Sequence, residues 1–448
     1  MKSRRAKVVH AVAGRPMIVY ILDSLSQLGV ARPIVVVGHG QEEVRAALAG
    51  RDAEFVEQNF RTGKGTAHAV LQTREALTGF GGDVLVLVGD APLLRAEELD
   101  ALVQVHREKG AAATVLTARM VDPTGYGRVL RDEEGDVAGI VEEKDATPEQ
   151  RATTEINTGI YCFDALSLFA ALGEVDCANA QGEYYLTDVV AVLRRRGKRV
   201  AARVTPFPEE ALGINSRQQL AQATAAVFAR TCRGLMDAGV TIEDPLATYV
   251  EPGVTVGADT VIKPQTFLEG RTTVGSGCTL GPGCRISDCR IGNNVFIEYS
   301  VLRSATVGED VTIGPFAYLR PGTDVGPGAK VGDFVEIKNS SIGAGSKVPH
   351  HSYIGDTTMG ARVNIGAGTI TCNYDGFEKH RTVIEDDVFI GANNNLVAPV
   401  RVGTGAYTAT GSTITKEVPP GALAVARARQ EHKEGWADRR RQRQRDES

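Results

Sequence analysis

Aliphatic residues return every six positions through most of the second half of the chain. The runs are Val274, Leu280, Ile286; Val307, Ile313, Leu319, Val325, Val331, Ile337; and Ile384, Ile390, Leu396, Val402, Thr408, Ile414. An α-helix repeats every 3.6 residues and cannot keep such a period on one face. Collagen is excluded because it needs Gly at every third residue. The period predicts a triangular parallel β-helix, in which each hexad is a short strand plus a turn, often at Gly.

The predicted β-helix covers residues 250–418, and its period is interrupted twice. Residues 339–342 shift the frame, and residues 371–381 form an inserted loop. Interruptions of a regular solenoid are where ligands usually bind. Both interruptions carry polar and ring side chains, so we expect the functional site of this half of the chain there.

The first half of the chain shows continuous apolar stretches that alternate with helical patterns. The predicted strands are residues 33–38, 83–90 and 112–117, and the predicted helices include residues 17–28 and 96–108. This alternation predicts an α/β domain with a mostly parallel sheet that is covered on both faces. Ligands of such sheets bind beyond the carboxyl ends of the strands, and Asp90 lies at one such end.

An Ala- and Gln-rich stretch over residues 217–238 predicts a helix that connects the two halves. The expected organisation is therefore an α/β domain, a linker helix, the β-helix and a disordered basic tail. Their bounds are residues 1–216, 217–249, 250–436 and 437–448.

Composition narrows the function classes. A net charge of −5 gives no global basic field that would indicate nucleic acid binding. No stretch has the roughly 18 apolar residues of a membrane span, and no apolar stretch follows the basic N-terminus as in a signal peptide. The seven cysteines form no CxxC pair, and Cys278 and Cys284 fit small core positions. We expect reduced thiols and a cytoplasmic protein.

Several motifs occur in a fixed order along the chain. They are DPTGYGR from Asp122, IVEEKDA from Ile140, EINTG from Glu155, NAQGEYY from Asn179, LRPG from Leu319 and NIGAGTITCNYDG from Asn364. In order and spacing they closely resemble the bacterial bifunctional enzymes of UDP-N-acetylglucosamine synthesis. The resemblance extends from Met1 to about Trp436. That family joins a glucosamine-1-phosphate N-acetyltransferase to an N-acetylglucosamine-1-phosphate uridylyltransferase.

The resemblance implies a Rossmann-like nucleotidyltransferase domain followed by a left-handed β-helix. It also implies a homotrimer, with acetyl-CoA sites between neighbouring β-helices. The family's first strand and its Gly-rich phosphate loop would precede Met1. We therefore expect either a translation start upstream of Met1 or weakened uridylyl transfer.

For acetyl transfer, the resemblance assigns the catalytic base to His350, and the adjacent His351 is the competing candidate. A base is needed because an ammonium cannot attack a thioester, and His suits neutral pH. The implied glucosamine-1-phosphate residues are Arg320, Lys338, Tyr353, Asn364 and Lys379. The implied acetyl-CoA residues are Ala367, Asn373, Tyr374, Ala392, Thr410 and Arg427, of which Ala392 and Thr410 differ from the residue types typical of the family.

For uridylyl transfer, the resemblance assigns Mg²⁺ to Asp90 and Asn215, whose oxygen atoms suit a hard cation. The implied UTP and UDP-N-acetylglucosamine residues are Lys7, Gln58, Gly65, Thr66, Gly127, Glu142, Asn157 and Asn215. Two residues are inserted near Phe60, between Gln58 and the Gly65–Thr66 pair. This insertion makes the position of Gln58 the least defined of the set.

The sequence therefore predicts an enzyme that uses glucosamine-1-phosphate, acetyl-CoA, UTP and N-acetylglucosamine-1-phosphate, without nucleic acid or membrane partners. One alternative is an acetyltransferase whose first domain has lost its activity. A second is another sugar nucleotidyltransferase with a purely structural β-helix, and a third is a non-enzymatic assembly subunit. His350, Asn373, Tyr374 and Lys379 argue against the second, because a purely structural β-helix has no need to place them together. Asp90, Asn215 and His350 argue against the third.

Overall fold

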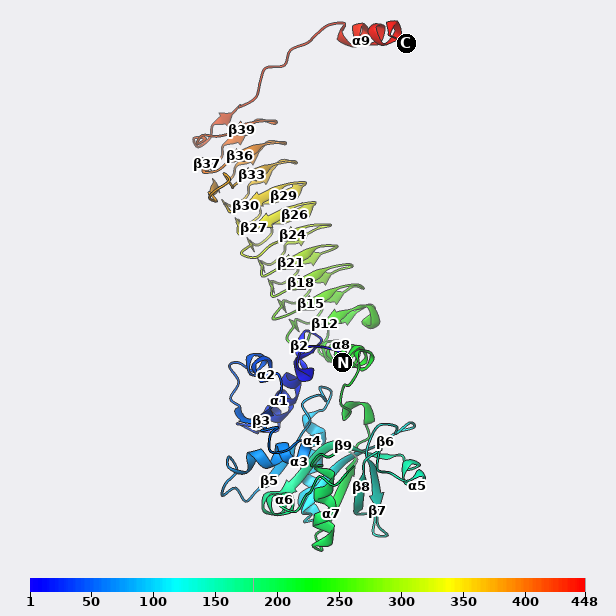
Figure 1. Cartoon of the computed structure of the whole chain (residues 1–448). Coiled ribbons are helices and arrows are strands. Elements are labelled where there is room, and N and C mark those ends of the chain that lie inside the picture. Colours follow the sequence, from blue (N-terminus) through cyan, green and yellow to red (C-terminus); the bar gives the residue numbers. More distant parts are fainter. Residues whose placement is uncertain (180, 448) are drawn as a thin grey trace. The chain divides into compact units, whose positions relative to one another are not determined.

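The computed structural model describes residues 1–179 and 181–447. Ala180, which belongs to the motif from Asn179, and Ser448, the last residue of the predicted tail, lie outside the described residues. The chain forms two compact units, Met1–Val227 and Phe228–Ser448 (Figure 1). Each unit has its own hydrophobic core.

The second unit is a stack of coils whose short strands form three parallel sheets in the described part of the chain. The first face contains β11 Thr241–Ile242, β14 Val261–Ile262, β17 Thr279–Leu280, β20 Phe296–Ile297, β23 Thr312–Ile313, β26 Lys330–Asp333, β29 Lys347–His350, β32 Asn364–Ile365, β35 Phe389–Ile390, β38 Tyr407–Thr408 and β40 Leu423–Ala424. The second face contains β12 Tyr249–Val250, β15 Phe267–Glu269, β18 Arg285–Ser287, β21 Val301–Arg303, β24 Tyr318–Leu319, β27 Glu336–Lys338, β30 Tyr353–Gly355, β33 Ile370–Cys372, β36 Asn395–Val397 and β39 Thr413–Ile414. The third face contains β13 Thr255–Val256, β16 Thr273–Val274, β19 Arg290–Ile291, β22 Thr306–Val307, β25 Asp324–Val325, β28 Ser341–Ile342, β31 Thr357–Met359, β34 Thr382–Ile384 and β37 Val400–Val402.

The six-residue aliphatics form the core of this prism, as the sequence predicts. Ile313, Leu319, Val325 and Val331 follow one another around a coil, and each is at most 2% exposed. Each coil pairs with the next through parallel strands, so residues about 17 positions apart become neighbours, as Val331 and Val348 do. The cores of adjacent coils therefore stack into one continuous apolar column.

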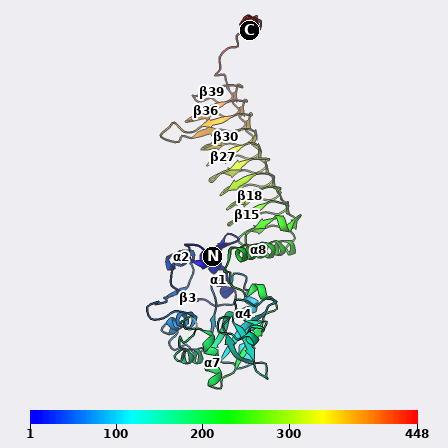
Figure 2. The same cartoon turned by 45° about the vertical axis from the view of Figure 1, so that its right-hand side comes forward.

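The period is interrupted more often than the sequence analysis recognised. Five-residue steps between buried aliphatics occur from Ile286 to Ile291 and from Leu302 to Val307, besides the one from Ile337 to Ile342. These three lie at the corner between the second and third faces, as does the step from Ile354 to Met359, whereas a further step from Ile297 to Leu302 lies at the corner between the first and second faces. The loop between β33 and β34 is the predicted insertion, and it projects from the stack (Figure 2). Cys278 and Cys284 are buried free thiols, as predicted.

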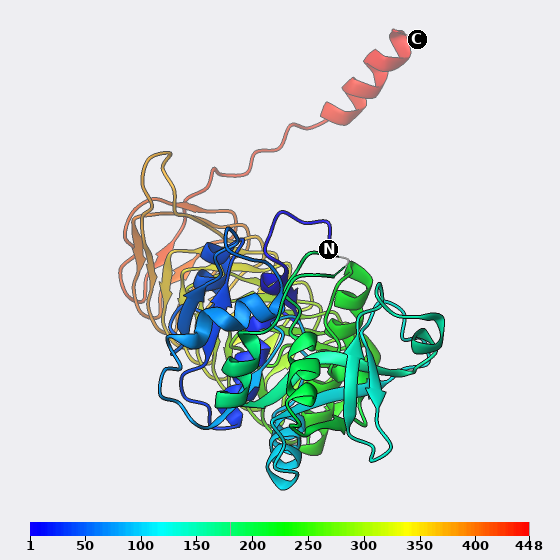
Figure 3. The same cartoon turned by 60° about the horizontal axis from the view of Figure 1, so that its bottom comes forward.

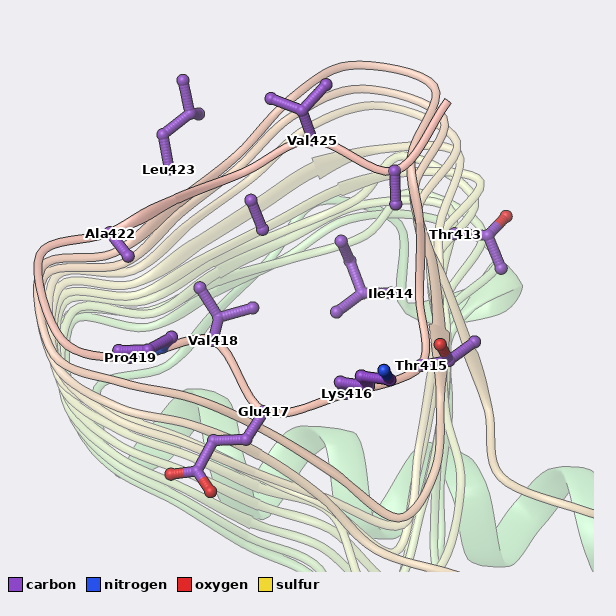
Figure 4. A pocket seen from close by; sticks show the side chains of 12 residues that line it. Thr413, Ile414, Thr415, Lys416, Glu417, Val418, Pro419, Ala422, Leu423 and Val425 are labelled. Atoms are coloured by element: carbon purple, nitrogen blue, oxygen red, sulfur yellow. The ribbon is translucent and has the colours of Figure 1, made fainter. Parts of the chain in front are cut away.

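The last coil leaves the interior of the prism open at its end (Figure 4). Ile414 and Val418 point into this opening, whereas Leu423 points away from it. The first strand of the stack, β11, already pairs with β14, so the coils begin at Thr241.

Strands of the first unit form a six-stranded mixed sheet and two small sheets. The strands are β1 Ala11–Val12, β2 Arg15–Pro16, β3 Ile34–Val37, β4 Glu54–Glu57, β5 Asp83–Val86, β6 Ala113–Arg119, β7 Arg128–Arg131, β8 Val137–Val141, β9 Glu155–Asp164 and β10 Val200–Val204. The α-helices are α1 Met17–Gln27, α2 Gln41–Ala47, α3 Thr66–Leu71, α4 Ala96–Glu108, α5 Pro148–Arg151, α6 Ala165–Leu172 and α7 Thr187–Arg195. Short 3₁₀ helices are η1 Lys7–Val9, η2 Gln72–Arg74, η3 Pro208–Glu210 and, in the second unit, η4 Pro245–Ala247.

Helices cover both faces of the mixed sheet, as the sequence predicts (Figure 3). Successive residues of β9 alternate between two cores. Tyr161 and Phe163 pack with α6 and α7, and Ile160 and Cys162 pack with α1 and α4. This alternation explains the continuous apolar runs, because both sides of each strand are buried.

The prediction that this sheet is mostly parallel is wrong. Only the β10–β6 pair is parallel among its described strands, whereas β9 pairs antiparallel with β5, β6 and β7, and β7 pairs antiparallel with β8. The apolar runs report burial on two faces but carry no information on strand direction. The direction is set by β9, which returns between β5 and β6 after the β7–β8 hairpin.

Two further helices lie outside the sheets. Helix α8 Arg217–Asp237 corresponds to the predicted connecting helix and runs through the point where the two units divide. Helix α9 Trp436–Asp446 occupies most of the stretch for which the sequence suggested a disordered tail, and its residues are exposed. Arg, Gln and Ala favour helix even without packing. No helix among the described residues is long and apolar enough to cross a membrane.

Candidate active sites

A column of residues at the corner between the first and second faces brings together predictions that were made separately. The strand register stacks Asp333, His350, Ala367, Ala392 and Thr410 on successive coils. Backbone hydrogen bonds tie this corner together: Asn393 N–H donates to Ala367 O at 2.7 Å. His350 and three predicted acetyl-CoA residues thus occupy equivalent positions along one edge of the prism.

His350 has a carboxylate partner on the preceding coil. Its Nδ1 lies 2.7 Å from Asp333 Oδ1. The competing candidate, His351, turns the corner with a left-handed φ of 44° and donates its backbone N–H to Asp333 O at 2.8 Å. Of the two imidazoles, His350 is therefore the one for which the structure provides a side-chain acceptor.

Cationic side chains gather on the second face, at the ends of its strands that lead to the third face. Arg320 directly follows strand β24, and Lys338 is the last residue of the adjacent strand β27. The register of the two strands therefore places these residues one above the other. Arg320 Nη1 forms an ion pair with Glu336 Oε1 at 2.8 Å. Tyr353 is the strand partner of Glu336 on the next coil. Three of the predicted sugar-phosphate residues are thus neighbours on one face.

Lys379, from the inserted loop, joins the same group. The adjacent Lys338 ammonium lowers the pKa of Lys379, and the Asp356 carboxylate partly offsets this effect. Lys338 Nζ lies 3.7 Å from Asp356 Oδ2. Two ammonium groups held this close favour an anionic ligand between them. Asn364, by contrast, lies on the first face, between Lys347 and Phe389.

The inserted loop is ordered by its own hydrogen bonds. Asp375 accepts N–H bonds from Phe377 and Glu378 and contacts His380 Nε2 at 2.7 Å. The Glu378 backbone bond, with the His380 and Phe377 bonds, holds the pKa of Asp375 well below its usual range. Tyr374 pairs with Lys379 across the loop, so the turn fixes both predicted ligand residues relative to each other.

Asn373 anchors the start of this loop to the sugar-phosphate group. Its Nδ2 donates to Asp356 Oδ2, and Asn339 Nδ2 donates to Asp356 Oδ1 at 2.6 Å. A side chain at Gly355 would meet the Tyr353 hydroxyl and Asn373 Nδ2. Further along the prism, Arg427 Nη1 donates to Thr410 O at 2.8 Å. The contact of Asn373 with Asp356 therefore links a predicted acetyl-CoA residue to the sugar-phosphate group. The contact of Arg427 with Thr410 links another to the end of the column.

In the first unit, three predicted residues that are far apart in sequence converge. Lys7 forms an ion pair with Asp90, and its Nζ donates to Asn215 Oδ1 at 2.5 Å. Ile214 N–H donates to Asp90 O at 2.9 Å, which holds the two segments together. A Cβ at Gly213 would lie 2.9 Å from Asp90 Oδ1, so this approach requires glycine.

The Gly-rich turn lies at the start of α3. Gly65 has a left-handed φ of 102°, and a Cβ there would collide with Tyr184 O. Gln58 Nε2 donates to Gly65 O at 3.2 Å, and Leu186 N–H donates to Thr66 Oγ1 at 3.0 Å. Despite the inserted residues, Gln58, Gly65 and Thr66 form one cluster.

A third cluster in this unit contains Gly127, Glu142 and Asn157. Asn157 N–H donates to Gly127 O at 2.8 Å, and the Glu142 carboxylate lies 3.5 Å from where a Gly127 Cβ would be. Thr187 Oγ1 donates to Glu142 Oε1 at 3.3 Å, while burial raises the pKa of Glu142. Burial, with a smaller contribution from the charge of Asp90, raises the pKa of Tyr126, the residue before Gly127.

Sequence reasoning missed several residues that the structure places in these groups. They are Asp333, Glu336, Asp356, Tyr184 and Thr187. The first three had a usable signal, because the coil length places residues about 17 positions apart side by side, as with Asp333 and His350. Tyr184 belongs to the motif from Asn179, but its contact with Gly65, like that of Thr187 with Glu142, forms only through long-range folding.

The fold and these groups define a two-unit transferase, in which a nucleotidyltransferase is followed by a hexapeptide-repeat acyltransferase. Comparison with known families supports both halves. The nucleotidyl transferase family matches residues 2–207, the bacterial transferase hexapeptide (six repeats) matches residues 304–339, and the hexapeptide repeat of succinyl-transferase matches residues 381–416.

Curated relatives extend over nearly the whole chain. The bifunctional protein GlmU of Heliobacterium modesticaldum is 55% identical over 98% of this chain and 95% of its own length. The bifunctional protein GlmU of Carboxydothermus hydrogenoformans is 51% identical over 97% of this chain and 97% of its own length. That of a Geobacillus species is 50% identical over 98% of this chain and 95% of its own length. The chain belongs to the family of bifunctional GlmU proteins. The predicted family and fold are thereby confirmed.

Proposed function

We propose that the two transferase activities of this bifunctional family are carried by the two groups of residues described above. Membership in the family makes the chain an acetyltransferase and a uridylyltransferase of UDP-N-acetylglucosamine synthesis, which serves the cell wall. The alternative of an acetyltransferase alone is not favoured, because both domains match their families. We assign uridylyl transfer to residues 1–216 and acetyl transfer to residues 250–436. The single observation that supports this most is the column of His350, Ala367, Ala392 and Thr410.

In the proposed acetyl transfer, His350 Nε2 removes a proton from the amine of glucosamine-1-phosphate. The amine nitrogen attacks the thioester carbonyl, the new C–N bond forms, and the C–S bond breaks as the tetrahedral intermediate collapses. CoA leaves as the thiolate and takes up the proton. Backbone N–H groups near Ala367 would stabilise the oxyanion in this proposal, because Ala367 follows His350 in the column.

The phosphate of the sugar is held, in this proposal, by Arg320, Lys338 and Lys379, because a dianion needs several cations and Arg offers a two-pronged donor. The mutual repulsion of the two ammonium groups supports this assignment, since it is relieved when an anion binds. Tyr353 and Asn364 would contact the sugar from two faces of the prism.

Acetyl-CoA would lie along the column and the inserted loop, against Ala367, Asn373, Tyr374, Ala392, Thr410 and Arg427. Several of these side chains are exposed on the single chain, Tyr374 at 60%. We propose a homotrimer in which a neighbouring β-helix covers this edge. The proposal rests on the family resemblance and is tested by the molecular mass in solution.

In the proposed uridylyl transfer, the sugar phosphate oxygen attacks the α-phosphorus of UTP in line, and pyrophosphate leaves. Gln58, Gly65 and Thr66 would hold the uracil, and Gly127, Glu142 and Asn157 the sugar. Lys7 would contact the phosphates and neutralise their charge. We place both reactions in the cytoplasm, where both cosubstrates are supplied.

Family membership implies a metal for this reaction in general terms, and we propose Mg²⁺. Asp90 and Asn215 fit it, because both present oxygen atoms, and these oxygens already contact one cation, the Lys7 ammonium. Bound there, the metal would neutralise charge on the phosphate oxygens. No group of three or more His, Cys, Asp or Glu side chains in the described residues forms a complete metal cage, so phosphates and water would complete the coordination.

The central test compares His350→Ala with His351→Ala in the full chain. Positioned general bases contribute roughly 10²- to 10⁴-fold. We expect His350→Ala to lower kcat for CoA release by about that factor and His351→Ala to stay within about threefold of the parent. Retention of full acetylation by His350→Ala, or a larger loss in His351→Ala, contradicts the assignment.

A further inference from the structure

The side chain beneath His350 in the column is a carboxylate that neither the sequence motifs nor the comparisons assign. Asp333 is the strand partner of His350 in the β26–β29 pair. Its Oδ1 lies 2.7 Å from His350 Nδ1. The pairing follows from the coil period itself, because the two residues are 17 positions apart.

The close approach of the two coils at this point requires a glycine. A Cβ at Gly332 would collide with the carbonyl of Pro349, the residue before His350. The backbone of Asp333 is fixed as well, because its carbonyl accepts the N–H of His351 at 2.8 Å. Both ends of the Asp333–His350 contact are therefore set by the backbone and not only by side-chain rotamers.

Two other carboxylates of the neighbouring groups are engaged by other side chains. Glu336 forms its ion pair with Arg320 at 2.8 Å, on the second face. Asp356 is engaged by Asn339, Asn373 and Lys338. Asp333 is thus the carboxylate that the structure directs at the proposed base.

An ionised carboxylate can only accept hydrogen bonds. The hydrogen bond from His350 is the largest of the effects that lower the pKa of Asp333, so its carboxylate is ionised at neutral pH. In the neutral imidazole, the proton must therefore lie on Nδ1, which leaves the lone pair on Nε2. When Nε2 accepts the proton of the amine, the carboxylate faces the new imidazolium.

We infer that Asp333 is a positioning residue for acetyl transfer: it holds His350 in the tautomer whose Nε2 is the base and stabilises the protonated ring. The inference rests on the proposed role of His350. It differs from that role because it concerns a second residue, which does not touch the substrate and acts through the imidazole alone.

The test uses Asp333→Ala, Asp333→Asn and a matched control, Asp324→Asn, in the full chain. Asp324 is an exposed aspartate on β25 of the third face. Partners that orient a metal-binding His typically contribute 10- to 100-fold, and we expect an effect of the same order for the partner of a base. We expect Asp333→Ala to lower kcat for acetylation about 10- to 100-fold, with the KM values of both substrates within about twofold. Asp333→Asn keeps an acceptor without the charge and should fall between Ala and the parent, while Asp324→Asn should match the parent.

A spectroscopic readout separates positioning from a general loss of structure. In protein labelled with ¹⁵N-imidazole histidine, the His350 signals are identified by their loss in His350→Ala. They should show the Nδ1–H tautomer in the parent and move toward the Nε2–H tautomer in Asp333→Ala. Urea unfolding followed by circular dichroism, measured on the same samples, reports that the β-helix of each variant is folded and should not change.

The double variant Asp333→Ala/His350→Ala distinguishes this inference from the role of His350. If Asp333 acts through His350, the double variant is no less active than His350→Ala, because residues that act as a unit are not additive. A further loss in the double variant overturns the inference, as does a parental kcat or an unchanged tautomer in Asp333→Ala. If His350→Ala itself retains activity, the proposed function fails first, and the tautomer of the ring still decides whether Asp333 orients it.

Discussion

The two units build their sites in opposite ways. In the β-helix, residues about 17 positions apart become neighbours by register, so one short repeat places Asp333 next to His350. In the nucleotidyltransferase unit, Lys7 and Asn215 meet across 208 positions of sequence. A site on the β-helix depends on the register between neighbouring coils. A site formed by segments distant in sequence depends on the folding of the whole domain. The two reactions should therefore respond to different kinds of change.

The largest expected effect is a clean separation of the activities. Asp90→Asn removes a carboxylate that we propose binds the metal, and it should lower uridylyl transfer by about 100-fold or more, since metal stabilisation is worth several kcal/mol. His350→Ala should affect only acetyl transfer. Both reactions are measured on both variants, by pyrophosphate and by CoA release. Loss of both activities in either variant would show that the units are not independent.

The next effect concerns the stacked core. Leu302 is fully buried in the second face, where its strand partner on the next coil is Leu319. Leu302→Ala should cost about 2–5 kcal/mol in the free energy of unfolding of the β-helix. The exposed Thr306→Ala, in the next strand, should stay within about 0.5 kcal/mol. Urea unfolding followed by circular dichroism measures both. Uridylyl transfer should survive in each variant, and its loss would count against separate cores.

A smaller effect sharpens the account of the Gly-rich turn. Gly65 has a φ of 102° with no space for a side chain, whereas Gly79 has a φ of 80° in open space. Gly65→Ala should raise the KM for UTP about tenfold or more, because a strain of 1–3 kcal/mol is added to a steric collision. Gly79→Ala carries the strain without the collision. Equal KM values in the two variants would contradict the close approach of Tyr184 to this turn.

The smallest effect is a pH dependence of the inserted loop. The pKa of Asp375 is lower in the folded protein than in the unfolded chain, so its contribution to stability is complete above about pH 4 and is lost as the pH falls through the folded pKa. Amide exchange of residues 373–381 should be faster in Asp375→Asn than in the parent at pH 5–7. This difference should shrink below pH 4. A difference that is independent of pH would mean that the carboxylate does not order the loop.

The prism could be predicted in detail from the sequence, because each inward position is one aliphatic residue, such as Ile313 or Leu319, and these residues recur every six positions. It did not show every five-residue step, since a shortened corner such as Leu302 to Val307 leaves the inward aliphatics in place. In the first unit, helix positions and covered faces followed from apolar patterning. Strand direction did not, because the place of β9 depends on a long return of the chain.

The same contrast holds for the site residues. The structure groups Arg320, Lys338 and Lys379, for which the motifs gave a common expectation. The carboxylates Asp333 and Asp356 lie among these groups but stand in no motif that the sequence alone made conspicuous. Their contacts follow only from the stacking of the coils, because a paired carboxylate cannot be told from an ordinary surface residue in the sequence.

The account's central claim is that one chain carries two separate transfer reactions, and two assays on the purified full chain test it most directly. One follows CoA release from acetyl-CoA with glucosamine-1-phosphate. The other follows pyrophosphate release from UTP with N-acetylglucosamine-1-phosphate and Mg²⁺. The account predicts that both proceed and that chelation of the metal abolishes only the second. Acetylation without any pyrophosphate release at saturating UTP and Mg²⁺ would contradict it.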